Sequence, residues 1–523
     1  MTLLTWIAAS TALAQVPAFP GAEGFGAHLT GGRDGDVHRV TTLADSGVGS
    51  LQWALDQPGP RIVVFAVSGV IEGDVRIPHG DLTLAGESAP GAGITIRGHL
   101  YSDYGTTFGN LIIRHIRVRP PGPDAEWAPA NHDGIQFSRN VGIILDHVDV
   151  SHGVDENIDL WGGAQDITIQ WSAITWPVYG GGHPDGDQHN YGIINGPGGG
   201  RISLHHNLFA HNKTRTPALA EGPADVRNNV VYNGREGFVH HNPANGDFNI
   251  IGNTYIQGES ADLSPFWFDP ENNSPPTRYY MADNEIEDPD DFSGNVDNPW
   301  TAPQGFLDAY TISCCGIDSS QFNGVGEFDW STDPGYVAIA TESSGDAYDR
   351  VLDCAGAWPR DVALTQAVDD TRNRAGQYGN YDPGDWMSGL TAEAPYLDED
   401  GDGMFDDWEL MVGLDPADPT DHLADMGGYN AIEAYLHTLA AGLDPCAADY
   451  EPPGTGPTDT DDPTDQPTGD DDDDDDGVGD LGADDTESSG GGCGCITSPG
   501  PGSLWVGILG MLILVRVRRR RVR

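Results

Sequence analysis

Two basic residues lie two positions apart in residues 201–217, whose sequence is RISLHHNLFAHNKTRTP. Lys213 is the only lysine of the 523-residue chain, and Arg215 follows it closely. If this segment is extended, the two side chains point to the same side. Such a pair can stabilise negative charge that develops during a reaction. Ordinary surface charge is the alternative interpretation, and the rest of the chain must decide between the two.

Two carboxylates lie four positions apart in residues 155–159, which read DENID. Ile158 and Leu160 are predicted to face the core, so alternation along the strand turns Asp159 outward and gives Asp155 the same parity. Carboxylate oxygens are preferred ligands of Ca²⁺, which tolerates irregular geometry. Solvated surface charge is again the alternative, because acidic residues are common throughout this chain.

A second acidic motif, at residues 398–409, reads DEDGDGMFDDWE. Its spacing fits a calcium loop of the EF type, which has side-chain ligands at positions 1, 3, 5, 9 and 12, a carbonyl ligand at 7 and glycine at 6. The residues at these positions are Asp398, Asp400, Asp402, Gly403, Met404, Asp406 and Glu409. We predict a structural calcium site here, with a metal-free acidic linker as the alternative. Trp408 onward and residues 429–441 are predicted to be helical.

Short apolar strands that recur along residues 62–256 must position the first two groups. Asn207, Asn229 and Asn253 occupy equivalent polar positions between strands, 22 and 24 residues apart. A repeat of this length indicates one coil per unit, which cannot bury its apolar face alone. Asparagines stacked in successive bends can hydrogen-bond to one another. We therefore predict an all-β fold, a right-handed parallel β-helix with one axial core, in preference to a β-sandwich or a propeller.

Two regions flank this repeat. Residues 50–56, SLQWALD, are predicted to form a short helix with Ser50 as its N-cap, suited to covering the open end of the coil. Residues 259–395 have weak periodicity and many Pro, Asp and Gly residues. We expect long coils packed on the β-helix there.

Acidic residues dominate the composition, with 81 Asp plus Glu against 25 Lys plus Arg and a formal net charge of −56. Six of these cations are arginines within the last eight residues, so the body of the chain is more acidic still. Such a surface repels nucleic acid and binds hard cations, so we expect no nucleic-acid partner. The 71 Gly and 37 Pro residues are typical of a loop-rich all-β protein.

The two ends of the chain differ from its body. Residues 1–14 contain a short apolar run ending in Ala-Leu-Ala, which predicts a signal peptide, with a buried first strand as the alternative. Residues 447–490 are rich in Pro, Thr, Asp and Gly and predict a disordered, extended acidic linker. Residues 491–523 contain two cysteines, the apolar run 504–515 and the arginine cluster. That run is short for a spanning helix, so we predict a marginal membrane segment.

The predicted organisation has five parts. They are a signal peptide (1–14), a β-helix catalytic domain (15–395), an EF-type calcium module (396–446), the acidic linker (447–490) and a sorting tail (491–523). Cys493 and Cys495 belong to the tail. The remaining cysteines, Cys314, Cys315, Cys354 and Cys446, lie in an exported domain where disulfides can form, but their connectivity cannot be deduced.

Four motifs along residues 18–258 follow the order of a known family. They are residues 18–55 (AFPGAEGFGAHLTGGRDGDVHRVTTLADSGVGSLQWAL), 82–98 (LTLAGESAPGAGITIRG), 152–172 (HGVDENIDLWGGAQDITIQWS) and 204–217 (LHHNLFAHNKTRTP). In these motifs the chain resembles the bacterial pectate lyases of the first polysaccharide-lyase family. The resemblance implies the pectin lyase-like β-helix and calcium-dependent β-elimination of polygalacturonate.

The resemblance also implies roles for single residues. Asp155 and Asp159 correspond to acidic calcium ligands, Asp133 in NHDGIQF aligns with a third, and Glu156 is the alternative to one of them. Arg215 matches the arginine that the family uses as proton acceptor. A guanidinium resists deprotonation. Arg215 can therefore act only with a depressed pKa, or by stabilising the enolate-like intermediate.

Two departures from the family's pattern concern its cations. The family has a lysine in the motif that here reads HPDGDQHNYG (183–192) and carries Asp185. A further arginine normally follows the catalytic one, where this chain has Ala218 and Ala220. Both departures remove cations that bind substrate carboxylates. Lys213 can compensate for one of them, so we predict that it binds substrate, and a partly esterified or different uronan is also a plausible substrate.

The tail has the order cysteine pair, apolar run and arginine cluster, and in this it resembles the MYXO-CTERM sorting tails. The resemblance implies processing by the sorting machinery of the envelope and display at the surface, with a permanent membrane anchor as the alternative. We expect a secreted or surface-displayed monomer with Ca²⁺ as its cofactor and pectate or a related polyuronate as its partner.

Two other functions stay open at the level of sequence. A β-helix hydrolase of the polygalacturonase type would use paired carboxylates as acid and base and would form no unsaturated product. A non-catalytic, uronan-binding surface protein is the other, because of the missing cations.

Overall fold

The computed structural model describes residues 16–121, 132–178, 189–260, 262–268, 277–297, 326–378 and 386–446. All of them belong to one compact unit, residues 1–458. The predicted signal peptide, linker, sorting tail and membrane segment lie outside the described residues, as do Cys314 and Cys315. Within the described ranges, no helix has the length and apolar character needed to cross a membrane.

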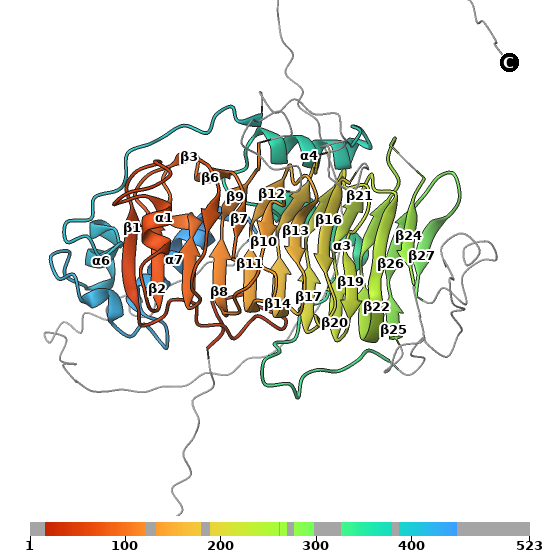
Figure 1. Cartoon of the computed structure of the whole chain (residues 1–523), viewed down its shortest axis with the longest axis horizontal. Helices are drawn as coiled ribbons and strands as arrows, with labels where there is room; N and C mark the ends of the chain where they lie inside the picture. Colours follow the sequence, from red (N-terminus) through yellow and green to blue (C-terminus); the bar gives the residue numbers. More distant parts are fainter. Residues whose placement is uncertain are drawn as a thin grey trace, which may run out of the picture. The chain divides into compact units, whose positions relative to one another are not determined.

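Three ladders of strands wind around one axis, and we name them sheets 1, 2 and 3 (Figure 1). Sheet 1 contains β4 (Val75–Arg76), β7 (Leu100–Tyr101), β10 (Ile135–Gln136), β13 (Glu156–Leu160), β16 (Tyr191–Asn195), β19 (Ala218–Glu221), β22 (Glu236–Ile251) and β24 (Ser264–Trp267). Sheet 2 contains β1 (Asp36–Val40), β2 (Arg61–Phe65), β5 (Leu82–Ala85), β8 (Gly109–Arg114), β11 (Val141–Asp146), β14 (Gln165–Gln170), β17 (Ile202–His205), β20 (Ala224–Arg227), the second half of β22, and β25 (Thr277–Ala282). Sheet 3 contains β3 (Gly69–Glu72), β6 (Ile94–Arg97), β9 (Ile116–Val118), β12 (Asp149–Ser151), β15 (Ala173–Thr175), β18 (Leu208–Ala210), β21 (Val230–Tyr232), β23 (Thr254–Ile256), β26 (Asn284–Glu287) and β27 (Ser293–Val296).

Neighbouring coils are parallel and in register. Strand β13 pairs with β16 in sheet 1, β11 with β14 in sheet 2 and β12 with β15 in sheet 3, all in the parallel sense. Among the described strands, only β26 and β27 pair antiparallel. Crossovers between parallel strands are right-handed almost without exception. The chain is therefore the predicted right-handed parallel β-helix and neither a sandwich nor a propeller.

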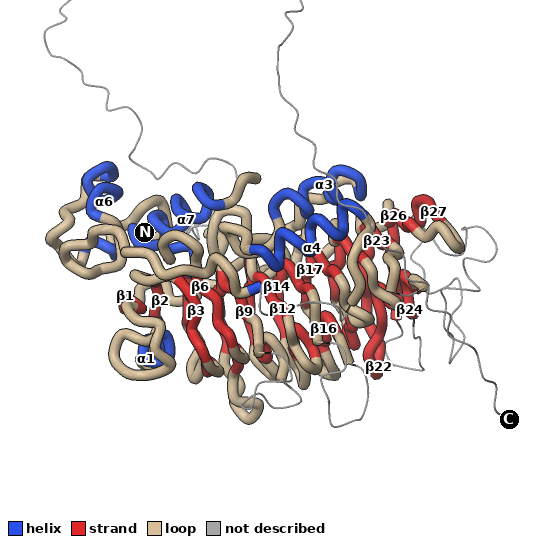
Figure 2. Tube along the Cα trace, turned by 90° about the horizontal axis from the view of Figure 1, so that it is seen from above, coloured by secondary structure: helices blue, strands red, loops and turns tan. Residues whose placement is uncertain are grey.

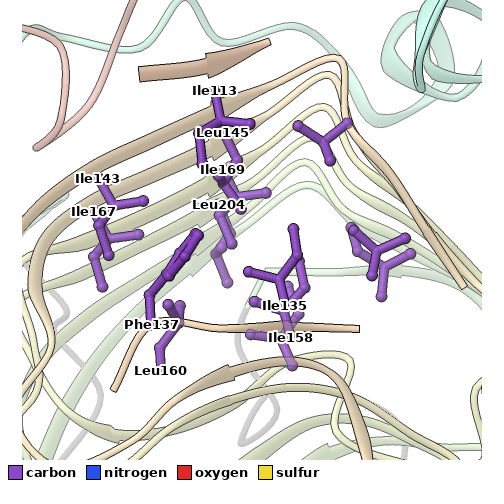
Figure 3. Packing of buried hydrophobic residues seen from close by; sticks show 14 of the residues in the cluster. Ile113, Ile135, Phe137, Ile143, Leu145, Ile158, Leu160, Ile167, Ile169 and Leu204 are labelled. Carbon is purple, nitrogen blue, oxygen red and sulfur yellow. The ribbon is translucent and has the colours of Figure 1, made fainter. Parts of the chain in front are cut away.

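Inward-pointing side chains of all three sheets form one apolar core along the axis (Figure 3). In sheet 2, Ile143 and Leu145 stack in register on Ile167 and Ile169 of the next coil. In sheet 1, Ile158 faces the same core, as predicted. Burying one such side chain stabilises the fold by about 1.5–3 kcal/mol. Each coil gains this energy only when a neighbouring coil covers it.

Asparagine side chains form the predicted ladder in the bend between sheets 2 and 3. Asn207 Nδ2 donates to Asn229 Oδ1 at 3.0 Å, and Asn229 Nδ2 donates to Asn253 Oδ1 at 2.9 Å. The ladder continues to Asn284, whose Oδ1 accepts from Asn253 Nδ2 at 3.0 Å. These side chains are buried, and a buried amide without partners would be costly. The ladder therefore fixes the register of four coils.

The helix α1 (Leu51–Leu55) closes the N-terminal end of the core, as predicted. The side chain of Ser50 accepts a hydrogen bond from Trp53 N at 3.2 Å, which makes it the N-cap. Leu51, Ala54 and Leu55 are fully buried in the axial core. Helix α1 thus shields the apolar end of the first coil from solvent.

Two helices that the sequence analysis did not predict cover the outer face of sheet 3 (Figure 2). They are α3 (Ser344–Cys354) and α4 (Val362–Asn373). Leu208 and Val230 of sheet 3 belong to one buried cluster with Val351 of α3 and Leu364 of α4. In the coils under these helices, sheet 3 is therefore apolar on both faces. The long coils expected in residues 259–395 are replaced in part by β24 to β27 and by these helices.

Residues 396–446 pack on the outer face of sheet 2, beside its first strands. The elements there are η1 (Gly86–Ser88) of the β-helix, α6 (Asp406–Val412), η4 (Asp421–Leu423) and α7 (Ala431–Leu443). Helices α6 and α7 confirm the helical prediction. Met404 and Ile432 share a buried cluster with Ile62 and Val64 of β2. The predicted module is thus held to the β-helix by an apolar contact of its own.

A disulfide and an ion pair link the C-terminal end of this module to the rest of the compact unit. A disulfide joins Cys354, at the end of α3, to Cys446, after α7. His147 lies at the bend after sheet 2, with its Nδ1 3.2 Å from Asp146 Oδ1 and its Nε2 3.4 Å from Asp444 Oδ2. Burial alone would lower the pKa of His147, but these two carboxylates raise it to about 9.

We expect His147→Asn to destabilise the protein at neutral pH and to have little effect above pH 9. Because the folded-state pKa of about 9 exceeds the ordinary value of 6.5, the charged imidazole stabilises the fold fully below pH 6.5, and this stabilisation is lost as the pH rises through 9. The shift corresponds to a free energy on the order of 3 kcal/mol. Melting temperatures between pH 5 and 10 measure the difference. The exposed His79→Asn is the control, and a wild-type-to-variant gap that stays constant with pH would contradict the assignment.

Candidate active site on sheet 1

One row of outward-facing residues crosses sheet 1 in register, and we name it the outer row. From coil to coil it contains Tyr101, Gln136, Asp159, Ile194, Ala218, Val239 and Trp267. Their strand neighbours Ile158, Ile193 and Leu219 face the axial core, so the outer row faces away from it. The row is polar as far as Asp159 and apolar beyond it.

Three carboxylates converge beside this row. Asp133, Asp155 and Glu156 each place one oxygen within 4.8 Å of the others. Asp133 Oδ1 accepts a hydrogen bond from Glu156 N at 3.0 Å, which holds the two coils together here. Asp155 Oδ1 lies 2.5 Å from His189 Nδ1. The structure thus brings together two of the predicted calcium ligands and the residue predicted as the alternative.

Asp159, the other predicted ligand, has neutral hydrogen-bond donors. Its Oδ2 accepts from Gln136 Nε2 at 3.2 Å, and its Oδ1 accepts from Trp161 N at 2.7 Å. Its outward direction is confirmed. Its predicted shared parity with Asp155 is wrong, because β13 begins only at Glu156 and Asp155 lies in the turn before the strand.

The carboxylates of this site together carry more negative charge than the neighbouring cations can neutralise. Burial raises the pKa of Asp133 well above its ordinary value, and the charges of Asp159 and Asp155 raise it further. Burial also raises the pKa of Asp159 to about 6. A bound divalent cation would remove this penalty. Ca²⁺ takes six to eight oxygens at 2.3–2.6 Å, so carboxylate oxygens this close together fit the ion.

Arg215 reaches the carboxylates from the loop between β18 and β19. Its guanidinium forms a close ion pair with Glu156. Its Cζ atom lies 4.1 Å from the ring centroid of Tyr191, a cation–π contact. Burial lowers the pKa of Arg215, and neighbouring carboxylates, Asp155 first, oppose this shift. The predicted catalytic arginine and the predicted calcium ligands therefore form one site.

The backbone at Arg215 is in the left-handed region, with φ at 62°, which is unusual for a residue other than glycine. Its carbonyl oxygen accepts a hydrogen bond from Ile193 N at 2.8 Å. Gly192 permits this approach, since a Cβ at that position would lie 2.4 Å from the same oxygen. The prediction that Lys213 and Arg215 point to the same side assumed an extended segment, and the positive φ shows that this assumption is wrong.

Lys213 and Arg235 lie on adjacent coils and are joined through their backbones. Lys213 N donates to Asn190 O at 3.0 Å, and Arg235 N donates to Lys213 O at 2.9 Å. The side chain of Arg235 is 48% exposed and pairs with Glu236. The sequence analysis missed this second cation. The 22-residue spacing of the asparagines could have found it, because 213 and 235 are also 22 apart.

His189 and Tyr191 are two further residues of the site that the sequence analysis did not single out. Their ring centroids lie 4.6 Å apart, and Tyr191 pairs in register with Glu156. The paired positions 156 and 191 are 35 residues apart, much more than the 22-residue repeat. Spacing therefore gave no signal for this pair.

Beyond Asp159 the outer row offers apolar surface instead of charge. Its cluster consists of the buried Ile194, Ala218 and Val239 with the partly buried Trp161 and Trp267. Ala218 and Ala220 are the positions where the resemblance implied an arginine. This half of the row is therefore built from aliphatic and aromatic groups, and its tryptophans are the members that are only partly buried.

The predicted calcium loop at residues 398–409 is formed in part. Asp398, Asp400 and Asp402 each place an oxygen within 4.8 Å of the others, as predicted. The side chain of Met404 packs against sheet 2, so only its carbonyl is available as the predicted ligand. Asp406 Oδ1 instead accepts a hydrogen bond from the loop's own backbone, Glu399 N, at 2.8 Å.

Glu409, the last predicted ligand of this loop, belongs to a second group. Its carboxylate groups with Asp402 and with Asp421, which the sequence analysis did not predict. Asp421 lies 12 positions beyond the end of the loop motif. No spacing rule for a twelve-residue loop reaches it.

Comparison with known proteins identifies relatives over most of the chain. No family model matches. Two proteins named "Probable pectate lyase C" are each 34% identical to it: that of Aspergillus fumigatus over 451 residues, 84% of this chain and 97% of the relative, and that of Aspergillus terreus over 460 residues, 84% and 98%. "Pectate lyase 5" of Ambrosia artemisiifolia is 28% identical over 233 residues, 40% of this chain and 55% of that protein. These relatives are fungal and plant proteins, so the bacterial subgroup of the resemblance stays a prediction.

Solved structures give weaker likenesses. A pectate lyase from a Paenibacillus species has 13% sequence identity and a TM-score of 0.43, covering 68% of this chain and 99% of that one. A pectate lyase bound to a hexasaccharide has 14% identity and the same TM-score of 0.43, covering 66% and 99%.

The extent of the fungal match exceeds the predicted similarity over residues 18–258. Since 84% of 523 residues is about 439, a contiguous match of this length includes residues from about 85 to about 439. It therefore contains the calcium loop at 398–409 as well as the carboxylates and Arg215. At 34% identity over nearly the whole length of the relatives, the chain belongs to the pectate lyase family and is a polysaccharide lyase.

Proposed function

We propose that this enzyme cleaves polygalacturonate or a closely related polyuronate by calcium-assisted β-elimination. The observation that carries the proposal is the contact of the Arg215 guanidinium with carboxylates that are grouped closely enough to hold a cation. The family supports the reaction class, and the site supports the cofactor. The proposed ligands are Asp133, Asp155 and Asp159, with Glu156, which groups with Asp133 and Asp155, as the alternative to Asp159.

Elimination removes the proton on C5 of a uronate, and the electrons of the C5–H bond form the C4=C5 double bond. The C4–O4 bond breaks with its electron pair leaving on O4, which takes up a proton from water. Bound Ca²⁺ would neutralise the uronate carboxylate and so make the C5 proton more acidic. Arg215 either accepts that proton or stabilises the charge that develops at C5. Burial, which lowers its pKa, supports the first role. Its pairing with Glu156 and Tyr191 holds it in place for both roles.

The choice among the ligands follows from charge compensation. Glu156 has a cationic partner in Arg215, and Asp155 contacts His189. Asp159 has only neutral donors within hydrogen-bond distance among its described contacts. A cation therefore relieves more repulsion at Asp159 than at Glu156, which favours Asp159 as the third ligand and leaves Glu156 to orient the arginine.

The outer row favours a substrate that is only partly charged. Lys213 and Arg235 are stacked on adjacent coils near Arg215, whereas the partly buried Trp267 offers apolar surface beyond Asp159. Methyl-esterified uronates present an apolar group where free uronates present a charge. We therefore propose a partly methyl-esterified polygalacturonate as the preferred substrate.

Two alternatives are less well supported. A hydrolase of the polygalacturonase type needs an acid and a base with room for water between them, about 6.5–9.5 Å apart in inverting enzymes. The three grouped carboxylates lie within 4.8 Å of one another, which suits a cation better. A non-catalytic binding protein would not need the partly buried Arg215 with its left-handed backbone. Absorbance of the unsaturated product separates the lyase from both.

Secretion or surface display, through the predicted signal peptide and sorting tail, is part of the proposal. The disulfide between Cys354 and Cys446 supports an oxidising compartment, since disulfides are rare in reducing ones. The net charge of −56 also agrees with an extracellular role, because an acidic surface attracts calcium.

Asp159→Asn should raise the calcium concentration needed for half-maximal activity by about tenfold or more, because it removes one charged ligand without changing core volume. Activity on polygalacturonate at graded free calcium measures this. Glu156→Gln is the matched comparison, and we expect it to lower turnover rather than raise the calcium requirement. The reverse pattern would make Glu156 the third ligand.

Arg215→Ala should lower turnover by at least about 10²-fold while weakening substrate binding much less, because the calcium site stays intact. Ultraviolet absorbance of the product gives both parameters. The substitution leaves Glu156 without its ion-pair partner, so melting of the calcium-loaded variant must be compared with that of Arg215→Lys, which keeps the charge. Turnover within threefold of the wild type in a well-folded Arg215→Ala protein would remove Arg215 from the mechanism.

Lys213→Ala and Trp267→Ala should have opposite substrate dependence. Loss of the lysine should lower kcat/KM more on demethylated than on esterified pectin, and loss of the tryptophan should do the reverse, each by about two- to tenfold. Kinetics on pectins of graded methylation test both variants together. A silent Lys213→Ala on every substrate would show that the lone lysine has no part in binding.

A further inference from the structure

The C-terminal module contains buried carboxylate oxygens that no hydrogen-bond donor in the described residues contacts. They are Asp400 Oδ2, Asp402 Oδ2, Glu409 Oε1, Glu409 Oε2 and Asp421 Oδ1. Glu409 is 0% exposed and Asp402 is 4% exposed. His422 Nδ1 lies 4.0 Å from Asp402 Oδ2, beyond hydrogen-bond distance. Leaving buried charges without a partner costs several kcal/mol, so these carboxylates must take up either protons or a cation.

The acidic side chains form two groups that share one residue. Asp398, Asp400 and Asp402 form the first, and Asp402, Glu409 and Asp421 form the second, with oxygens within 4.8 Å of one another in each. We propose that these five carboxylates bind one Ca²⁺ ion and that Asp421, from outside the loop motif, closes the site. The ion then joins the loop at 398–409 to the segment 415–423, which connects α6 to α7.

The geometry assigns Asp421 to the ion and Asp406 to the backbone. Asp421 uses Oδ2 to accept a hydrogen bond from Asp415 N at 2.9 Å and leaves Oδ1 buried without a donor. Asp406, the first residue of α6, accepts a hydrogen bond from Glu399 N. The loop thus replaces the ligand expected at its ninth position by a carboxylate from the next segment.

The donor set fits Ca²⁺ better than other divalent ions. All five ligands are hard carboxylate oxygens, and Glu409 can offer both of its oxygens. Ca²⁺ accepts such crowded, irregular sets, whereas Mg²⁺ requires octahedral geometry and retains water. Transition metals prefer sites with nitrogen or sulfur ligands. Burial raises the pKa of Asp402 to about 7 and that of Glu409 to about 8, which agrees with a site that needs a positive charge.

The loop is fixed to the β-helix independently of the ion. Gly403 lies against sheet 2, where a Cβ at its position would be 2.8 Å from a methyl group of Val37. Asp398 Oδ2 lies 3.2 Å from Arg39 Nε. The segment that carries Asp421 is mostly exposed; η4 contacts α7, and His422 approaches Asp402, but no hydrogen bond among the described residues joins segment 415–423 to the loop 398–409. Calcium is therefore the link that orders this segment, and through it the start of α7.

Hydrogen exchange of the wild-type protein tests the proposal without any substitution. Adding calcium to chelated protein should slow amide exchange in residues 415–423 at least tenfold, and to a similar degree as in residues 398–409. Slower exchange in the loop alone would exclude Asp421 from the site. Unchanged exchange in both segments would show that the module binds no calcium.

Asp421→Asn provides the second test, with Asp418→Asn as its control. Asp418 is an exposed residue of the same segment, and its Oδ1 accepts a hydrogen bond from Thr420. Both are made in the Asp155→Asn background, which weakens the proposed catalytic site, so that calorimetric titration and melting report mainly on the module. Asp421→Asn should weaken calcium binding at least tenfold and reduce the calcium-induced rise in melting temperature, whereas Asp418→Asn should change neither. Equal affinity in the two proteins would overturn the proposal, and neither result depends on whether the lyase mechanism is right.

Discussion

Parallel register between coils is the constraint on which the other features of this protein depend. One ladder of backbone pairs places Gln136 beside Asp159 and Asp159 beside Ile194, although these residues are widely separated in sequence. The asparagine ladder locks the same register in the bend between sheets 2 and 3. A slip by one residue would turn the row of outward residues into the core. The register therefore fixes Asp159 and Glu156 in sheet 1, and the hydrogen bond from Glu156 N holds Asp133 of the preceding coil beside them.

Features that repeat could be predicted from the sequence, and features that interrupt the repeat could not. The spacing of Asn207 and Asn229 gave the coil, the ladder and the fold. Strand alternation failed at Asp155 and at Arg215, because a turn and a positive φ break the two-residue period at both positions. Helices α3 and α4 were not predicted, although the sequence carried a signal for them. Leu208 and Phe209 are adjacent apolar residues on opposite faces of sheet 3, which indicates that something covers its outer face. Asp421 was missed because only tertiary packing brings it to the loop.

Buried carboxylates are paired differently in the structural and in the functional regions of the molecule. Buried carboxylates that have only a structural role are paired with arginines, as Arg114 is with Glu87 and Asp146. At the active site and in the C-terminal module, carboxylates gather with fewer cations than charges. Replacing those carboxylates by neutral residues would remove a penalty from the folded state. Their presence agrees with the ion binding that we propose for both sites.

These two acidic sites depend on different parts of the fold, and this separates turnover from stability. The carboxylates around Arg215 belong to sheet 1, whereas Asp402 and Glu409 belong to a module packed on sheet 2. The module is also held by an apolar cluster and by the disulfide at Cys446. Loss of its ion should thus loosen one segment without opening the axial core. In this proposal, calcium at sheet 1 serves the reaction and calcium in the module serves the stability of the fold, so a single calcium requirement measured by activity would combine two equilibria.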